Sequence, residues 1–213
     1  MTAKNQDPCA GNKPYHHGNL RDALILAAAD LIREQASVDF AMVDAARRAG
    51  VSSAAPYRHF RDREALLEAV CHVAFRALTE STRDIAARVD TSSEEGIIAI
   101  GKGYIDFVTR HPEFYDLMWG DMGLRALESV DEAIKNSGFY VLVDAVTNWC
   151  HANGVSNYDA AQLAVKLWAT AHGLACLTMN RSLDNFLPDV DSHELLDSTT
   201  RTFLEGVRQE SGD

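Results

Sequence analysis

Long hydrophobic runs are missing from this sequence of 213 residues. The first twenty residues contain no apolar run, which argues against a secretory signal. The most apolar long stretch, residues 163–179, is interrupted by Lys166 and His172 and is too short to span a bilayer comfortably. We therefore expect a cytoplasmic protein without a membrane partner.

Cysteine is also scarce, and β-strand patterns are missing. The four cysteines, Cys9, Cys71, Cys150 and Cys176, show no paired spacing, so reduced thiols in a cytoplasmic protein are the plain interpretation. No segment of useful length alternates apolar and polar residues, so no strands are predicted. The chain is 46% hydrophobic and 24% charged, near the averages of soluble globular proteins, so disorder is not indicated.

Motifs of catalysis are lacking too. We find no Gly-rich phosphate loop, no nucleophile motif and no obvious carboxylate pair. The eight histidines include His16 and His17, and His172 lies one helical turn before Cys176. A pair at that spacing could supply two metal ligands, but no third or fourth ligand follows at a credible spacing. We expect no enzyme activity, no cofactor and no metal, and we interpret His172 as a core or interface histidine.

Positive charge is concentrated in one short stretch of an acidic chain. The net charge is −11, yet residues 1–75 are balanced and the whole deficit lies in residues 76–213. Between residues 47 and 63, five arginines and His59 accompany a single acid, Asp62. Phosphate binding requires local positive charge, because neutralising phosphates releases condensed counterions. The stretch is either a phosphate-binding surface or a solvated charged face.

The N-terminal part predicts short helices after a polar arm. Residues 1–18 are rich in Gly, Pro and Asn and are interpreted as a mobile arm. From Asn19 a helix is expected, with one apolar face. That face consists of Leu20, Leu24, Ala27, Ala28 and Leu31. A second short helix is expected over residues 42–49, where Gly50 ends it.

Two more helices are predicted between residues 52 and 86. Ser52 or Ser53 can cap a third helix that runs to about Phe60, because a hydroxyl satisfies an unpaired N–H at a helix start. Pro56 then falls in or just past the first turn, where its missing donor costs little. Asp62 can cap a long fourth helix. Its apolar stripe includes Leu66, Val70, Val73 and Ala77.

The remainder also has helical patterns, so the predicted fold class is all-α. Three capping pairs open further helices, the first of which ends before Pro112. These pairs are Ser92 with Glu95, Ser156 with Asp159, and Asp191 with Glu194.

The penultimate helix is apolar almost all round, and such a helix must be covered on both sides. A second copy of the chain could cover the outer side, and burial inside one larger core is the alternative. We expect a homodimer through the helices near 157–180 and 191–209. The candidate interface residues are Leu167, Ala171, Leu174, Leu195, Thr199 and Phe203.

The most informative stretch is residues 40–67, FAMVDAARRAGVSSAAPYRHFRDREALL. Two short helices separated by a tight turn at Gly50 match a helix-turn-helix. Ala45 and Ala46 are small enough for the second helix to cross closely, and Val51 fills the space between the helices. The next helix then exposes hydroxyls, a phenol and cations, which suit contacts to phosphates and base edges. A helical hairpin inside a bundle is the alternative.

These residues resemble a known family. RRAGVSSAAPYRHFRDREALL is similar to the DNA-binding signature of the TetR-like regulators, and YHHGNLRDALILAAADLI (residues 15–32) is similar to the opening of one branch. In LWATAHGLA, Trp168, His172 and Gly173 resemble the Trp–His–Gly feature of that branch's C-terminal domain. YIDFVTRHPEFYDLMW (residues 104–119) also resembles that branch. The resemblance covers residues 15–208 and is most specific over 45–67.

The resemblance implies a homodimeric transcriptional regulator that is commonly a repressor. It implies a DNA-binding domain at 19–64 after the arm at 1–18, and a ligand-binding and dimerisation domain at 65–213. The implied partners are a double-stranded, near-palindromic DNA operator and a small-molecule effector. Residues 52–59 would enter the major groove, with Tyr57 and His59 on phosphates. The candidate DNA contacts are Arg21, Ser52, Ser53, Ala54, Tyr57, Arg58, His59 and Arg63.

Two positions depart from the family pattern. Ala41 stands where Ser or Thr usually precedes the second helix, which removes the usual cap, and Asp39 is the expected substitute. Arg63 replaces the usual Lys at the start of the fourth helix, keeping the charge and changing its geometry. Ala41 and the acidic C-terminal part leave open an alternative, a helical interaction module of the same fold that has lost DNA binding.

The middle of the C-terminal domain is rich in aromatic and thioether side chains. Ligand pockets are mostly apolar, with a few polar groups that set orientation. We expect a small, largely hydrophobic effector between the fifth, seventh and eighth helices, oriented by His172 or Asn148. An ordinary helical core is the alternative for each residue. The candidate ligand contacts are Tyr104, Phe107, Met118, Trp119, Met122, Tyr140, Trp149, Trp168 and His172.

Overall fold

The computed structural model describes residues 20–123 and 137–211, and within these ranges the regular structure is helical, without strands. The predicted all-α class is therefore confirmed. The predicted arm at 1–18 and the helix start at Asn19 lie outside the described residues. In chain order the elements are α1 (Leu20–Gln35), α2 (Met42–Arg48), the 3₁₀ turn η1 (Pro56–Arg58), α3 (Arg63–Ala86), α4 (Glu94–Arg110), α5 (Pro112–Trp119), α8 (Gly138–Ala152), α9 (Ala160–Met179), α10 (Ser182–Phe186) and α11 (Ser192–Ser211).

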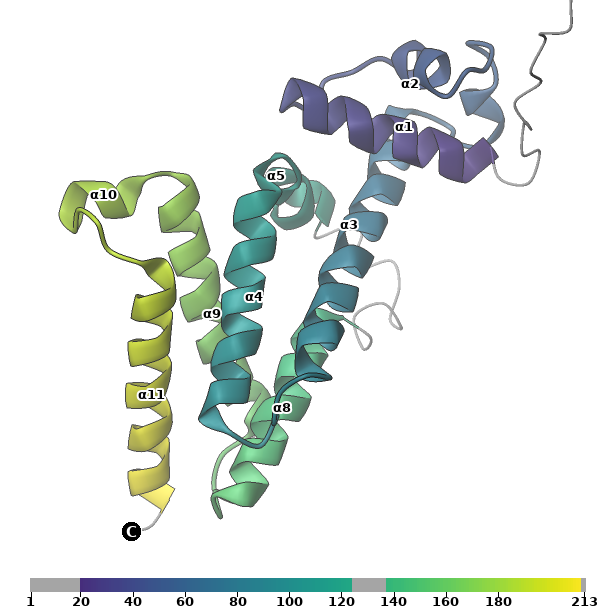
Figure 1. Ribbon diagram of the computed structural model, residues 1–213. Coiled ribbons are helices and arrows are strands. Elements are labelled where there is room, and N and C mark those ends of the chain that lie inside the picture. The colour runs from purple at the N-terminus through teal and green to yellow at the C-terminus, as the bar shows by residue number, and fades with distance from the viewer. Residues whose placement is uncertain (1–19, 124–136, 212–213) are drawn as a thin grey trace, which may run out of the picture.

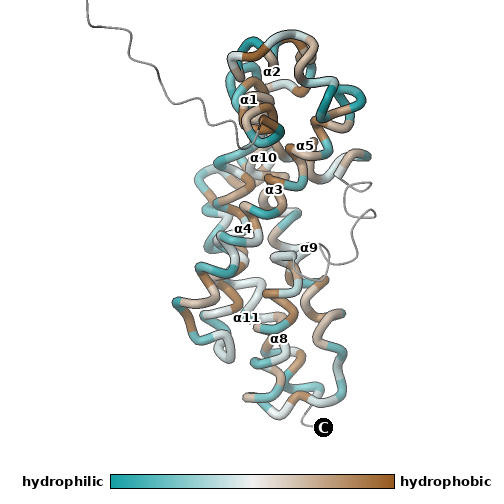
Figure 2. Tube along the Cα trace, turned by 90° about the vertical axis from the view of Figure 1, so that its right-hand side faces the viewer, coloured by the Kyte–Doolittle hydropathy of each residue, from teal (hydrophilic) through white to brown (hydrophobic). Residues whose placement is uncertain are grey.

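The molecule consists of a small head and a larger helical body (Figures 1 and 2). The head contains α1, α2, η1 and the start of α3. Its core is apolar: Leu24, Ile32 and Leu66 are fully buried there. Ala45 and Ala46 of α2 are also buried.

The turn after α2 follows the prediction for Gly50. This residue has φ of +72°, a conformation that costs glycine little and other residues more. The N–H of Val51 donates to the Ala46 carbonyl at 3.0 Å, closing the helix end as a Schellman motif does. The expected cap at the other end of α2 is wrong. Asp44 accepts from the Ala41 N–H at 3.1 Å, whereas Asp39 lies 3.3 Å from the Arg63 guanidinium.

The predicted third helix over 52–60 is also wrong in extent. Only η1 is helical, and its N-cap is Ala55, without a side-chain cap from either serine. Pro56 explains the difference. It has no N–H to continue a ladder of helical hydrogen bonds from the preceding residues. The Ala55 N–H instead closes a separate turn on the Ser52 carbonyl at 3.0 Å.

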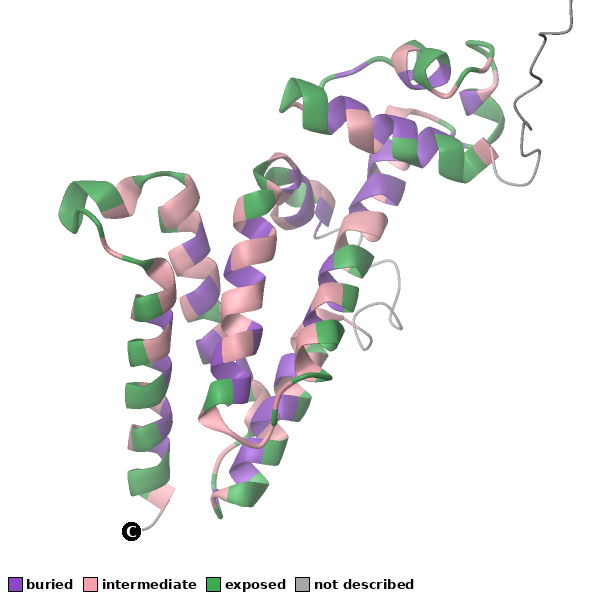
Figure 3. Ribbon diagram, in the orientation of Figure 1, coloured by how far each residue is buried: buried purple, intermediate pink, exposed green. Residues whose placement is uncertain are grey.

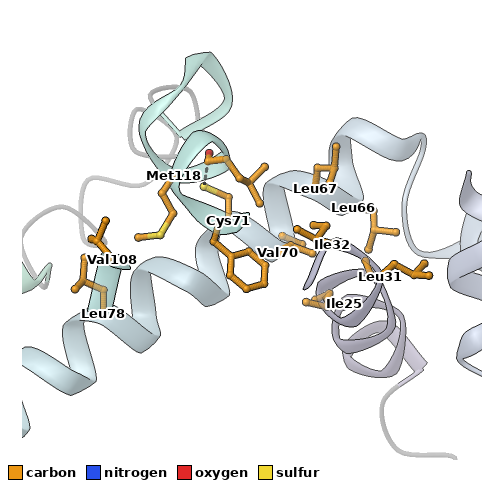
Figure 4. Close-up of a cluster of buried hydrophobic side chains, with 14 of the residues drawn as sticks. Ile25, Leu31, Ile32, Leu66, Leu67, Val70, Cys71, Leu78, Val108 and Met118 are labelled. Carbon is orange, nitrogen blue, oxygen red and sulfur yellow. Dashed lines mark hydrogen bonds between the residues drawn. The ribbon is translucent and has the colours of Figure 1, made fainter. Parts of the chain in front are cut away.

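Helix α3 joins the head to the body without interruption. Its 24 residues correspond to about 36 Å at the α-helical rise. Asp62 caps it as predicted, because its carboxylate accepts from the Ala65 N–H at 2.8 Å. The boundary expected at 64/65 therefore falls inside one helix. Figure 4 shows the result: Leu66 and Val70 pack beside α1, whereas Leu78 packs beside Val108 of the body.

The body packs α4, α8, α9 and α11 against one another beside the lower half of α3. Helix α11 buries the side facing its neighbours and exposes the opposite side (Figure 3). Two capping pairs are shifted by local geometry. Ser93, not Ser92, caps α4 by accepting from Gly96 N at 3.0 Å, and Asp159, not Ser156, caps α9. Asp191 accepts from the His193 N–H at 2.8 Å and starts α11 as predicted.

No described helix is long and apolar enough to cross a membrane.

Candidate DNA-contact surface and ligand cavity

The turn between α2 and α3 forms an exposed polar surface on the head. Buried Pro56 and Phe60 anchor it from below. Between them, Tyr57 is 60% exposed, which is unusually high for a large aromatic side chain. The predicted DNA contacts on this turn are all exposed. They are Ser52, Ser53, Ala54, Tyr57, Arg58 and His59.

The arginines around this turn differ in their partners. Arg58 has no carboxylate partner within residues 20–123 and 137–211, so its charge is available to a ligand. The other four pair with acids of the head: Arg47 with Asp44, Arg48 with Glu34 and Asp30, Arg61 with Asp62, and Arg63 with Asp39. Most of these pairs are exposed, and exposed ion pairs contribute little to stability.

Two predicted contacts outside the turn take part in the packing of the head. The Arg21 guanidinium lies over the Phe60 ring, 5.2 Å from its centroid. This cation–π contact leaves Arg21 exposed beside the turn. Arg63 donates to the Val38 carbonyl at 2.8 Å and so ties the α1–α2 loop to the start of α3.

A cavity of about 320 Å³ lies in the body, surrounded by α3, α4, α5, α8, α9 and α11. Of the predicted ligand contacts, Tyr104, Trp119 and Trp168 line it. Trp149 and Met118 do not. Trp149 is buried in a core cluster with Leu142 and Leu163, and Met118 packs among the buried side chains near Val108 (Figure 4).

The remaining predicted ligand contacts also lie off the cavity wall. Phe107 packs on His111 with ring centroids 5.2 Å apart, Met122 packs against the core cluster that contains Met118, and Tyr140 is exposed. Asn148 donates to Thr91 at 3.0 Å, away from the cavity.

Sequence reasoning missed most of the wall. Aliphatic and threonine side chains of α3, α4, α8 and α11 complete it, and no sequence signal separates these from ordinary core. They include Leu78, Thr79, Thr82, Ile97, Ile100, Leu142, Leu196 and Thr200. Leu167 and Ala171, expected at a dimer interface, are buried and also line the cavity, so both side chains face inward.

A chain of polar side chains runs from the cavity wall into α5. The Tyr104 hydroxyl lies 2.6 Å from His172 Nδ1, and the Tyr115 hydroxyl lies 3.0 Å from Nε2. Tyr115 also lies 2.7 Å from the Cys176 thiol. A neutral imidazole donates from one nitrogen and accepts at the other. One tyrosine therefore donates to His172 while the other accepts from it.

Burial sets the protonation states of these hydrogen-bonded side chains. It raises the pKa values of Tyr104 and Tyr115, so both phenols stay protonated at neutral pH. Burial lowers the pKa of His172, which favours the neutral imidazole. His172 also contacts the rings of Trp119 and Trp168, with centroids 5.3 and 5.2 Å away. His172 thus lies behind the cavity wall as a partly buried, hydrogen-bonded residue.

Helix α5 connects this polar chain to the head. It contacts α1, α3 and α4. Glu113 at its first turn lies 3.9 Å from Arg33 of α1. The Cys71 thiol of α3 donates to the Leu117 carbonyl of α5 at 3.4 Å, drawn as a dashed line in Figure 4. Burial raises the pKa of the Cys71 thiol to about 12, so it remains protonated.

Two family models match the chain. Residues 24–70 match the model for bacterial regulatory proteins of the tetR family. Residues 97–203 match a tetracyclin repressor-like C-terminal domain. The chain belongs to the TetR family. The predicted family membership is thereby confirmed, and the narrower branch with the Trp–His–Gly feature stays a prediction.

Solved structures resemble this TetR-family chain over most of its length. A protein of unknown function from Rhodococcus sp. RHA1 is 29% identical with a TM-score of 0.75, covering 92% of this chain and 98% of that chain. FadR from Bacillus subtilis, in complex with stearoyl-CoA, is 16% identical with a TM-score of 0.64, covering 87% and 98%. PfmR from Thermus thermophilus is 17% identical with a TM-score of 0.55, covering 85% and 97%. No curated protein matches the chain.

The outer faces of α9 and α11 carry apolar groups that the TetR-family protomer leaves uncovered. Leu177 of α9 is 40% exposed, and Leu174 is partly exposed. On α11, Leu195 and Phe203 are partly exposed and Thr199 is exposed. Lys166 lies over the Phe203 ring, 5.7 Å from its centroid. These residues, unlike Leu167 and Ala171, are available to a second protomer.

Among the described residues, no group of three or more His, Cys, Asp or Glu side chains could hold a metal ion.

The lowered pKa of His172 predicts a pH-dependent stability. The folded chain holds His172 neutral, whereas the unfolded chain takes up a proton near pH 6.5. Stability from this residue is thus present above about pH 6.5 and is lost as the pH falls below it. The free energy of unfolding, measured with urea at pH 7.5 and 5.5, should decrease less between these pH values for His172→Gln than for the wild type. His151→Gln, at an exposed site, is the control; equal losses in wild type and His172→Gln would contradict the assignment.

Proposed function

We propose that this TetR-family protein is a transcriptional repressor that binds a near-palindromic DNA operator as a homodimer. The observation that carries the proposal is the exposed turn at 52–59, where Tyr57 and Arg58 project from a rigid, buried base. Hydroxyl, phenol and guanidinium groups there match the donors that contact phosphates and base edges. Arg21 stands beside the turn as a further phosphate contact.

A small hydrophobic effector in the body cavity is the proposed release signal. The cavity has walls of apolar side chains with few polar groups, as small-molecule sites do. Tyr104, Trp119 and Trp168 are the proposed ligand contacts, and His172 holds Tyr104 in place. A ligand changes operator affinity only if it binds one arrangement of the heads better than another. Helix α5, between the cavity and α1, is the proposed connection.

The homodimer is proposed to form through α9 and α11. Leu174, Leu177 and Phe203 supply apolar surface that a second protomer would cover. Two-fold symmetry places two identical heads on one duplex, so the operator's half-sites should be about one helical turn or a multiple apart. The alternative function is a helical interaction module that does not bind DNA, and the acidic body favours it. Measuring whether the protein binds an operator distinguishes the regulator from this module.

Operator binding should depend on Tyr57 and Arg58. With an operator selected from random DNA, Tyr57→Ala and Arg58→Ala should each weaken binding by about 1–3 kcal/mol. Arg58→Ala should also reduce the salt dependence, because one fewer cation displaces counterions, whereas the neutral Tyr57 should leave it unchanged. Fluorescence anisotropy at several salt concentrations measures both effects.

The control for these variants is Arg76→Ala, which removes an exposed arginine from α3 far from the turn. It should retain wild-type affinity, and circular dichroism should show that all three variants are folded. Wild-type affinity in both Tyr57→Ala and Arg58→Ala would refute the assignment of this turn. Selection that yields no preferred DNA would favour the module without DNA binding.

Charged substitutions on the outer face should separate the protomers. Leu177→Glu and Phe203→Glu place a carboxylate in the proposed interface, where burying an unpaired charge is costly. Both variants should be monomers by light scattering at micromolar concentration and should bind operator poorly. Leu26→Glu is the matched control, since Leu26 is 61% exposed on α1, outside the interface. A wild-type monomer, or dimers in both interface variants, would rule out this interface.

A further inference from the structure

The ligand cavity is least covered by its own protomer on one side of α9. Val165 of α9 lines the cavity, yet 48% of its surface is exposed to solvent. Phe139 and Trp168, also on the wall, are partly exposed, and their rings meet edge-on with centroids 6.2 Å apart. By contrast, the wall residues from α11, Leu196 and Thr200, are buried. Val165 therefore borders both the cavity and the solvent.

A second, smaller hollow lies where α9 meets α11. Its volume is about 70 Å³, and two of its wall residues, Leu167 and Thr200, also line the ligand cavity. Both of these side chains are buried. A group placed in the hollow would therefore pack on the same two side chains as a molecule in the cavity. The hollow is completed by Lys166, Thr170, Thr199 and Phe203.

Four residues of α9 form an apolar stripe on its outer side. Val165, Ala169, Gly173 and Leu177 are four residues apart, so they follow one face of the helix. Ala169 is exposed, and Leu177 is 40% exposed. A Cβ atom added at Gly173 would meet no atom of the described residues within 4 Å. In the part of the chain that the structure describes, the stripe is thus accessible from Val165 to Leu177.

The charge of α9 suits this stripe to a second copy of the chain. Two molecules that each carry a net charge of −11 repel one another, so the surfaces that meet must carry little negative charge. Helix α9 has no Asp or Glu in its 20 residues, and its one Lys, Lys166, lies over the Phe203 ring. Two-fold symmetry brings the same patch of both protomers together. The small residues Ala169 and Gly173 leave room for a second α9 to pack closely.

We propose that a second protomer completes the effector site: its α9 packs on the stripe and covers the cavity edge at Val165. Its side chains at the adjoining hollow also pack against Leu167 and Thr200, the residues shared with the cavity wall. The inference rests on the proposed function, in which the cavity holds the effector and α9 belongs to the dimer interface. In the protomer alone, Val165 has solvent behind it, whereas in the dimer it is backed by protein.

Such a site links ligand binding to dimerisation. A ligand loses more contact with water in the dimer, so it binds more tightly there. The linkage is reciprocal, so a ligand that prefers the dimer also strengthens the dimer. A ligand then lowers operator affinity by changing the arrangement of the two heads, and the protomers stay together.

Butylbenzene is the probe for this linkage, because apolar cavities take up compact hydrocarbons. Calorimetric titration should show about tenfold tighter binding to the wild-type dimer than to the Leu177→Glu monomer. Leu177 is not among the wall residues, so this substitution leaves the composition of the cavity unchanged. Leu26→Glu, the dimeric control, should bind butylbenzene like the wild type. Equal affinities of dimer and monomer, or no binding to the wild type, would overturn the proposal.

The wild-type chain tests the same linkage without a substitution. Sedimentation velocity over a dilution series gives the dissociation constant of the dimer with and without saturating butylbenzene. Each dimer has two cavities, so a tenfold preference per cavity lowers this constant by the square, about a hundredfold. A dissociation constant that is unchanged or raised would contradict the linkage.

A ligand-free measurement tests whether the partner covers Val165. The thiol introduced by Val165→Cys should react more slowly with Ellman's reagent in the dimer than in the monomeric double variant with Leu177→Glu. The rate of the native cysteines is subtracted in both cases. Leu26→Cys, at an exposed site on α1, should react equally fast with and without Leu177→Glu. Equal rates for Val165→Cys in dimer and monomer would refute the contact.

Failure of this inference can be told from failure of the proposed function. Operator binding by the ligand-free chain is measured on the same preparations. A dimer that binds its operator but shows equal butylbenzene affinity in dimer and monomer would contradict this inference alone. A dimer that binds no operator would contradict the proposed function.

Discussion

The continuity of α3 is the constraint on which the rest of the structure depends. One helix supplies buried side chains to both the head and the body: Leu66 and Val70 pack near α1, and Cys71 and Leu78 pack toward α5 and α4. Burying each such side chain contributes about 1.5–3 kcal/mol relative to exposing it. Bending or separating the helix at the head would expose this surface. The head therefore moves with α3.

Helix α5 gives the cavity a second route to the head. It begins beside α1, where Glu113 faces Arg33, and ends at Trp119 on the cavity wall. Tyr115, between these ends, is tied through His172 to Tyr104 on the same wall. Packed side chains and hydrogen bonds of this kind have few alternative arrangements. A ligand that displaces Trp119 or Tyr104 would thus act on the helix that supports α1.

Local sequence signals predicted the head well, because the signals there are steric and specific. Gly50 adopts the left-handed conformation that its position after α2 requires, and Asp62 caps α3. The third helix was predicted to be too long, because helical periodicity does not show that Pro56 lacks the N–H needed to continue the hydrogen bonds of the helix.

The cavity and the outer faces of the body were harder to predict from sequence. Helix α9 is apolar nearly all round, so periodicity could not tell its inner side from its outer side, and Leu167 and Ala171 were placed outward although they face the cavity. The abundance of aromatic residues correctly predicted that Tyr104, Trp119 and Trp168 line the cavity. It also led to the wrong prediction for Trp149, which belongs to the ordinary core. Whether a side chain borders empty space is decided by tertiary packing, which a single sequence does not encode locally.

The central claim is that occupancy of the body cavity controls DNA binding by the head. The most direct test is operator affinity with and without a saturating cavity ligand, measured on the same dimer. A coupling of about 1–3 kcal/mol corresponds to a 5- to 150-fold loss of operator affinity. We expect a loss in this range, reversed when the ligand is removed. Equal affinity of the empty and the occupied protein for the operator would contradict the account, because a ligand that binds both states equally shifts nothing.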